Sequence, residues 1–150
     1  MSKKIIWGDI LPKGSIRFEE LYSDGLKNIG PNTGDLVSFV GIVRASSIYE
    51  NKKVVALEVE GWEEGREIMQ GIAKQTFENY HLTLTYIVHL IGRINVGEPI
   101  VYVLLGSEHR EAAFKALDFI VHLYKKEAPV WKKEIYEDGS GKWIYTHKEE

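Results

Sequence analysis

The fold is decided by LTLTYIVHLIG (82–92), PIVYVLLG (99–106) and SEHREAAFKALDFIVHLYKK (107–126). The first segment alternates between polar and apolar residues with a period of two, and the second is apolar on both faces, so both predict β-strands. A turn that contains Gly97 joins them. The third segment has the spacing of a helix, which Pro129 prevents from extending.

This predicted helix has a start signal and one apolar face. Ser107 stands where a hydroxyl can cap the free N–H groups of the first turn. We expect the apolar face to pack against the sheet, and it consists of Ala113, Phe114, Leu117, Ile120, Val121 and Tyr124.

Five further segments are predicted from apolar spacing and turn residues. They are an amphipathic stretch within 1–34 that the turn NIGPNTGD ends, strands at 36–44 and 53–60 around a polar loop, a helix at 63–80, and a hairpin near the C-terminus around Asp138-Gly139-Ser140-Gly141. Grouped strands with helices, rather than a repeating βαβ unit, predict an α+β fold with a mainly antiparallel sheet and two principal helices. The 150 residues fall within the range of one domain, which we expect to span 1–150.

The composition restricts the chemistry. The chain has no cysteine, which excludes a disulfide scaffold, a thiolate metal site and a cysteine nucleophile. Any sulfur chemistry must therefore use sulfur that another molecule supplies. The formal charge of −3 argues against a general nucleic-acid-binding protein.

The first fourteen residues, MSKKIIWGDILPKG, contain only a short apolar run, which Gly8, Asp9 and Pro12 interrupt. This pattern predicts neither a signal peptide nor a membrane span. We therefore expect a cytoplasmic protein.

A first candidate site lies where a buried strand meets the helix, at Ser107-Glu108-His109-Arg110. A helix N-terminus offers free N–H groups and a positive dipole end, which suit an anion. His109 and Arg110 would add a titratable donor and a planar fork of donors. The alternative is an ordinary capped helix with two solvated side chains.

A second candidate lies at the proline corner that follows the helix. Because the chain turns at Pro129, Lys125 and Lys132 can approach one another from the two sides of the corner. Clustered ammonium groups, here beside Trp131, can donate or accept a proton or hold a carboxylate. The alternative is a solvated helix end whose lysines complement the helix dipole.

Two further side chains have weaker signals. Arg44 ends an apolar strand, where its guanidinium can emerge at the rim of the sheet. His89 lies in a β-patterned run, and we expect a histidine with satisfied hydrogen bonds there rather than a ligand. The histidines show no recognised metal-ligand spacing, so no metal site is predicted.

Together these residues resemble the large subunit of molybdopterin synthase. The resemblance runs across about residues 36–143 and is most specific in two motifs, S-x-H-R-x-x-A-F at 107–114 and K-x-x-x-P-x-W-K-x-E at 125–134. It implies a hammerhead-like α+β fold, a homodimer within a heterotetramer, and no cofactor. It also implies a ubiquitin-like small subunit whose Gly-Gly tail carries a thiocarboxylate and delivers sulfur to cyclic pyranopterin monophosphate.

By the same resemblance, Lys125 and Lys132 are the catalytic lysines, and Arg44, His109 and Arg110 bind the substrate. The chain departs from the family at Leu90, where an arginine is usual, and near the C-terminus, where it offers only His147 or Lys148 as a basic residue. Two other functions stay open: a noncatalytic adaptor for a ubiquitin-like tail, and a nucleic-acid-binding domain, which the acidic balance disfavours.

Helix geometry predicts a site that two copies of the chain share. Arg110 and Lys125 are 15 residues apart on the predicted helix, which places their backbones about 22 Å apart at the usual rise per residue. One small substrate cannot contact both side chains of a single helix, and the segment has no internal Gly or Pro to bend it. We therefore expect a two-fold dimer in which the helix start of one copy faces the helix end of the other.

Overall fold

The computed structural model describes residues 4–144 of the chain, and these form seven strands and three helices. In chain order the elements are β1 (Ile6–Pro12), α1 (Phe18–Asn28), β2 (Asp35–Ile42), β3 (Val54–Gly61), α2 (Gly65–Asn79), β4 (Leu84–Asn95), β5 (Pro99–Ser107), α3 (Arg110–Glu127), β6 (Val130–Tyr136) and β7 (Gly141–Ile144). No helix within residues 4–144 is long and apolar enough to cross a membrane.

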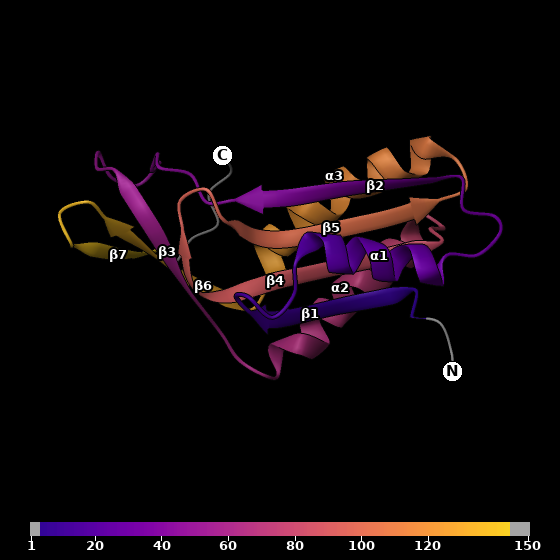
Figure 1. Cartoon of the computed structure of the whole chain (residues 1–150), viewed down its shortest axis with the longest axis horizontal. Coiled ribbons are helices and arrows are strands. Elements are labelled where there is room, and N and C mark those ends of the chain that lie inside the picture. Colours follow the sequence, from indigo (N-terminus) through magenta and orange to yellow (C-terminus); the bar gives the residue numbers. More distant parts are fainter. Residues whose placement is uncertain (1–3, 145–150) are drawn as a thin grey trace.

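The strands form one sheet in the order β2-β5-β4-β3-β6-β7, and β1 adds to it beside β4 (Figure 1). The pairs along this order are antiparallel, whereas β1 pairs with β4 in parallel. The predicted α+β class with a mainly antiparallel sheet is thus confirmed. The hairpin of β6 and β7 turns at the predicted Asp138-Gly139 position.

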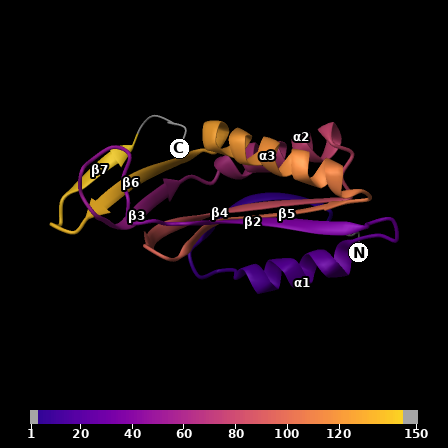
Figure 2. The same ribbon diagram turned by 90° about the horizontal axis from the view of Figure 1, so that it is seen from above.

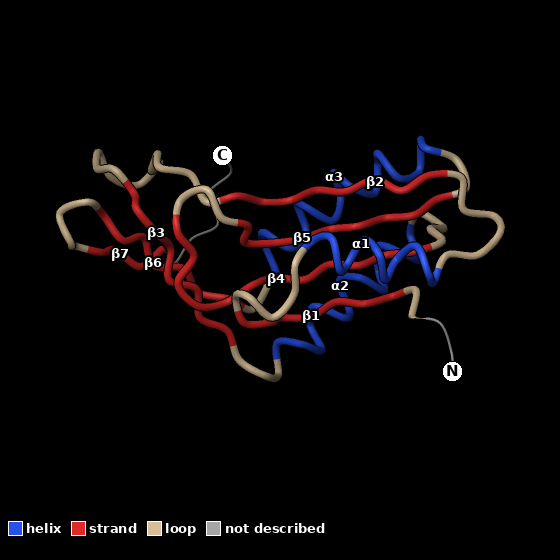
Figure 3. The backbone as a smooth tube through the Cα atoms, in the orientation of Figure 1, coloured by secondary structure: helices blue, strands red, loops and turns tan. Residues whose placement is uncertain are grey.

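The long strand β4 joins two parts of the sheet. Its residues from Thr85 to Ile91 pair with β1, and from Gly92 onward the same strand pairs with β3. Gly92 has a φ of 109°, a conformation that residues with a side chain rarely adopt, and it lies at this change of partner. The smaller part, β3 with β6 and β7, therefore extends beyond one end of the main sheet, as the backbone trace shows (Figure 3).

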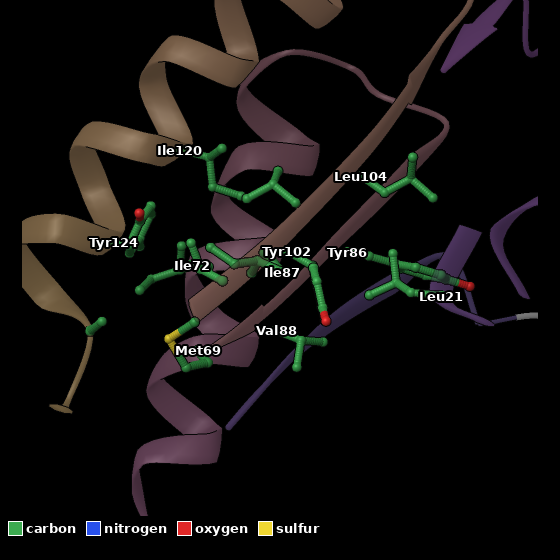
Figure 4. Close-up of a cluster of buried hydrophobic side chains, with 14 of the residues drawn as sticks. Leu21, Met69, Ile72, Tyr86, Ile87, Val88, Tyr102, Leu104, Ile120 and Tyr124 are labelled. Atoms are coloured by element: carbon green, nitrogen blue, oxygen red, sulfur yellow. The ribbon is translucent and has the colours of Figure 1, made fainter. Parts of the chain in front are cut away.

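Helices cover both faces of the main sheet. Figure 2 shows α1 on one face and α2 with α3 on the other. In the core, Leu21 of α1 lies with Tyr86 and Leu104, while Ile72 and Ile120 pack on the opposite side (Figure 4). β4 is buried at every position from Leu84 to Leu90 because both of its faces are covered.

The N-terminal part of the chain contains two elements that the sequence predicted incompletely. The amphipathic stretch is a third helix, α1, in addition to the two principal helices expected. The strand β1 was not predicted at all, because Gly8 and Asp9 interrupt its apolar pattern. Gly8 is required where it stands, since a Cβ there would collide with the backbone carbonyl of Met69 in α2.

Two details predicted for α3 are wrong. Ser107 is the last residue of β5, and the N-cap residue is His109, whose side chain makes no capping hydrogen bond. The Ser107 hydroxyl instead lies 2.8 Å from the Asp35 carboxylate. Phe114 is 58% exposed, because the buried stripe of α3 runs through Ala113, Ala116, Ile120 and Tyr124, and Phe114 lies about 100° around the helix from Ala113.

Candidate active site

A cavity of about 600 Å³ lies at the junction between the main sheet and its smaller extension. Its walls come from the end of β2 and the loop after it, from β3, β4 and β5, from the last turn of α3, and from β6 and β7. This volume is in the range of sites that bind small molecules. The polar side chains that line the cavity are Arg44, Ser46, Tyr49, His89, Tyr124, Lys125, Lys132 and Glu134.

The strand β6 supplies one wall because alternate residues of a strand point to the same face. Val130, Lys132 and Glu134 all line the cavity. Trp131 points to the other face, where its ring lies 4.2 Å from that of Trp62. Trp131 is therefore not beside the cavity lysines, contrary to the arrangement considered from the sequence.

The corner at Pro129 brings two lysines to one cavity. Lys125 lies in the last turn of α3, which ends where the Ala128 N–H donates to the Tyr124 carbonyl at 2.8 Å. Lys132 follows on β6, and both lysines line the cavity. The chain therefore presents both lysines to the same cavity from the two sides of the corner.

Arg44 completes a set of three cations. It follows β2 and lines the same cavity as Lys125 and Lys132. Among residues 4–144, Glu134 supplies the only carboxylate in the lining, so cationic side chains there outnumber anionic ones by three to one. This arrangement suits a ligand that carries negative charge, such as a phosphate or a carboxylate.

Glu134 is a buried carboxylate with its own donors. The Ser47 hydroxyl donates to it at 2.6 Å and the Tyr136 hydroxyl at 2.7 Å. Burial and the hydrogen bond to Glu134 raise the pKa of Tyr136 above its usual range, so this hydroxyl keeps its proton. The Ser47 oxygen also accepts from the backbone N–H groups of Tyr49 and Glu50, which ties the loop after β2 to β6.

His89 is fully buried in β4 and lines the cavity. Its Nδ1 lies 3.0 Å from the Leu90 carbonyl oxygen, whereas its Nε2 has no hydrogen-bond partner among residues 4–144. Leaving such an atom unsatisfied costs about 1–3 kcal/mol. The expectation of a fully satisfied sheet histidine is therefore wrong for Nε2.

The His89 ring is neutral. Burial, together with the positive charge of Lys132, lowers the pKa of His89 from 6.5 to about 3. The neighbouring Leu90, which stands where the family usually has arginine, has its side chain in the hydrophobic core. It contributes apolar packing there in place of a charge.

His109 and Arg110 lie at the opposite end of α3 from the cavity. Their side chains are 80% and 72% exposed, and each lies near an adjacent glutamate in a pairing that contributes little in water. α3 runs without interruption to Glu127 (Figure 2), so the separation of about 22 Å between Arg110 and Lys125 stands. One chain does not bring the two candidate sites together.

Sequence reasoning missed several cavity residues. Glu134 could have been found from its spacing, because it lies two residues after Lys132 in a predicted strand. Tyr49 and Tyr124 reach the cavity from a loop and from a helix that share no local pattern with β6. His147 and Lys148 lie outside the described residues.

Within residues 4–144 no group of three or more His, Cys, Asp or Glu side chains could hold a metal ion.

An α+β protein with a cationic cavity at a sheet junction has a site whose charge suits a small anionic ligand. The chain matches the family described as "MoaE protein" over residues 13–127, and it belongs to this family.

Relatives agree with this assignment. The chain is 34% identical to the molybdopterin synthase catalytic subunit of Brucella melitensis over 142 residues, which cover 91% of this chain and 85% of that protein. It is 36% identical to the Pseudomonas aeruginosa protein of the same name, over 84% of this chain and 81% of that one. A solved structure of molybdopterin synthase from Staphylococcus aureus has a TM-score of 0.79 and 28% identity, and the match covers 93% of this chain and 97% of that chain.

Proposed function

We propose that this chain is the catalytic subunit of a molybdopterin synthase. It transfers sulfur from the thiocarboxylated C-terminus of a ubiquitin-like small subunit to cyclic pyranopterin monophosphate and so forms the dithiolene of molybdopterin. Membership in the family and the names of its relatives support this function. The observation that carries it is the convergence of Lys125 and Lys132 on one cavity.

The cavity residues fit the two anions that must meet in this reaction. Arg44 offers a fork of donors to the substrate phosphate. Lys125 and Lys132 offer ammonium groups to the thiocarboxylate, and they can exchange protons with the reacting atoms. A positioned acid or base contributes about 10²- to 10⁴-fold in rate. The chain has no cysteine, so the small subunit supplies the sulfur.

The small subunit delivers its sulfur through a flexible Gly-Gly tail. A tail without side chains can thread a narrow opening and add backbone hydrogen bonds to the wall. Such a tail would place its terminal thiocarboxylate beside the cavity lysines. Removing the two glycines from the partner should therefore abolish turnover, and product formation by the truncated partner would contradict this route.

A second copy of the chain completes the site. His109 and Arg110 are too far from the cavity of their own chain, but a two-fold dimer can present them to the cavity of the other copy. The active assembly is then a homodimer that carries two small subunits. A cytoplasmic location stays a prediction of the sequence.

Reconstitution tests the function directly. The purified chain, a thiocarboxylated small subunit and cyclic pyranopterin monophosphate are incubated, and molybdopterin is measured. We expect product with the thiocarboxylated partner and none with the same partner ending in an ordinary carboxylate. Tight binding of the thiocarboxylated partner without any product would instead identify a noncatalytic adaptor.

A further inference from the structure

The proposed reaction gives no role to the buried imidazole of His89. Among the cavity side chains within residues 4–144, it is also the one with a buried polar atom that lacks a hydrogen-bond partner. Its ring is fully buried, and Nε2 has no hydrogen-bond partner within residues 4–144. Native proteins rarely retain a buried polar atom of this kind without a use for it. A donor that reaches Nε2 is therefore expected in the working state of the site.

The tautomer of His89 follows from its other nitrogen. A carbonyl oxygen can only accept a hydrogen bond, so the 3.0 Å contact between Nδ1 and the Leu90 oxygen requires the proton on Nδ1. A neutral ring has one such proton. Nε2 is then an acceptor whose lone pair lies in the plane of the ring.

Lys132 is the cation that acts on this ring. Its positive charge lowers the pKa of His89, and both side chains line the same cavity. Tyr124 meets the imidazole edge-on with ring centroids 6.1 Å apart, and its ring forms part of the packing around the imidazole. The hydrogen bond to the Leu90 carbonyl orients the lone pair of Nε2.

We propose that His89 is a positioning residue for Lys132: a change of rotamer in the Lys132 side chain, which does not hydrogen-bond Nε2 in this structure, brings its ammonium group to donate to Nε2 and so fixes the place of that group in the cavity. Burial keeps the imidazole neutral, so His89 accepts this hydrogen bond without taking the proton. Lys132 is thereby held in one orientation as the substrates bind. The catalytic consequence rests on the proposed function, whereas the contact itself does not.

Nitrogen NMR on the full chain with ¹⁵N-labelled histidine tests the contact independently of activity. We expect Nδ1 of His89 to carry the proton and Nε2 to lack one at neutral pH. Substituting Lys132→Met should shift the Nε2 resonance. The matched control is Lys133→Met, which removes an equal charge from a side chain that lies over Trp143, away from the cavity. A protonated Nε2, or equal shifts in the two variants, would overturn the proposal.

Two variants of His89 test the catalytic consequence. His89→Asn can keep a donor to the Leu90 carbonyl but leaves nothing at the Nε2 position, whereas His89→Gln can place an amide oxygen there. We expect kcat to fall roughly tenfold to a hundredfold in His89→Asn, with a smaller change in KM and a partial rescue in His89→Gln. If kcat fell equally in the two variants, and in proportion to a fall in their unfolding temperatures, the role of His89 would be purely structural and the proposal would be overturned. If the wild-type chain makes no molybdopterin while the NMR result holds, the proposed function fails and the contact stands.

Discussion

Lys125 and Lys132 line one cavity from two different elements, whereas the lysines next to them in sequence, Lys126 and Lys133, do not line it. We predict that Lys125→Ala and Lys132→Ala each lower the rate of sulfur transfer by about 10²-fold or more, because each removes an ammonium group from the reacting atoms. The unfolding temperature should change little, since neither side chain belongs to the hydrophobic core. Molybdopterin formation under single-turnover conditions measures the effect.

The controls for this prediction are Lys126→Ala and Lys133→Ala. Each removes the same charge one residue away, and neither side chain lines the cavity. Both should retain nearly full activity. If Lys126→Ala were as damaging as Lys125→Ala, the catalytic role would have been assigned to the wrong residue.

His89 should make the fold sensitive to acid. Its pKa is about 3 in the folded chain and 6.5 in the unfolded chain. Between these two pH values the imidazole is mostly protonated in the unfolded state and mostly neutral in the folded state, so acid favours unfolding. As the pH falls from 6.5 to 4.5, this group alone should lower the free energy of unfolding by roughly 2 kcal/mol.

Urea denaturation at these two pH values measures that loss. His89→Gln should remove it, whereas His109→Gln, which changes an exposed histidine, should keep it. Because the carboxylates titrate alike in all three proteins, only the difference between variants matters. An unchanged pH dependence in a folded His89→Gln protein would show that His89 does not resist protonation.

At the scale of elements, β1 depends on close contact with α2. A Cβ at Gly8 would collide with the Met69 carbonyl, and the Gly8 N–H donates to the Gln70 side chain at 2.8 Å. We predict that Gly8→Ala lowers the free energy of unfolding by about 1–3 kcal/mol or more, because strand and helix backbones must separate. Chemical denaturation measures the loss.

Gly71→Ala is the matched control, since a Cβ at Gly71 on α2 meets nothing within 4 Å. It should be neutral or slightly stabilising, because alanine favours a helix over glycine. A Gly8→Ala protein as stable as the wild type would mean that β1 does not press against α2.

The same elements show where sequence reasoning succeeds and where it ends. Strands β2 to β5 and helices α2 and α3 were predictable because each carries its own periodic apolar pattern. β1 was not, since its pairing with β4 joins residues about 80 positions apart and leaves a local pattern broken by Gly8 and Asp9. Similarly, the Pro129 corner placed Lys125 and Lys132 on one cavity. The surroundings of His89 were not predictable, because they include Tyr124 of α3, whose ring centroid lies 6.1 Å from that of the imidazole.

At the scale of the whole molecule, α3 separates the two candidate sites by its own length. An uninterrupted helix from Arg110 to Glu127 is rigid, and Arg110 stays about 22 Å from Lys125. In the proposed two-fold dimer the start of each α3 would face the end of the other, which would create two equivalent sites. Each site would then take Lys125 and Lys132 from one copy and His109 and Arg110 from the other.

Mixing two inactive variants tests this arrangement. In a dimer of one Arg110→Ala chain and one Lys125→Ala chain, one site keeps both residues and the other has lost both. Random 1:1 assembly should therefore restore about a quarter of the wild-type activity, since half of the dimers are mixed and half of their sites are intact. A mixture of Lys125→Ala with Lys132→Ala should recover nothing, because these two lysines belong to the cavity of a single chain. Absence of recovery in verified mixed dimers of the first pair, or full activity in a verified monomer, would rule out the shared site.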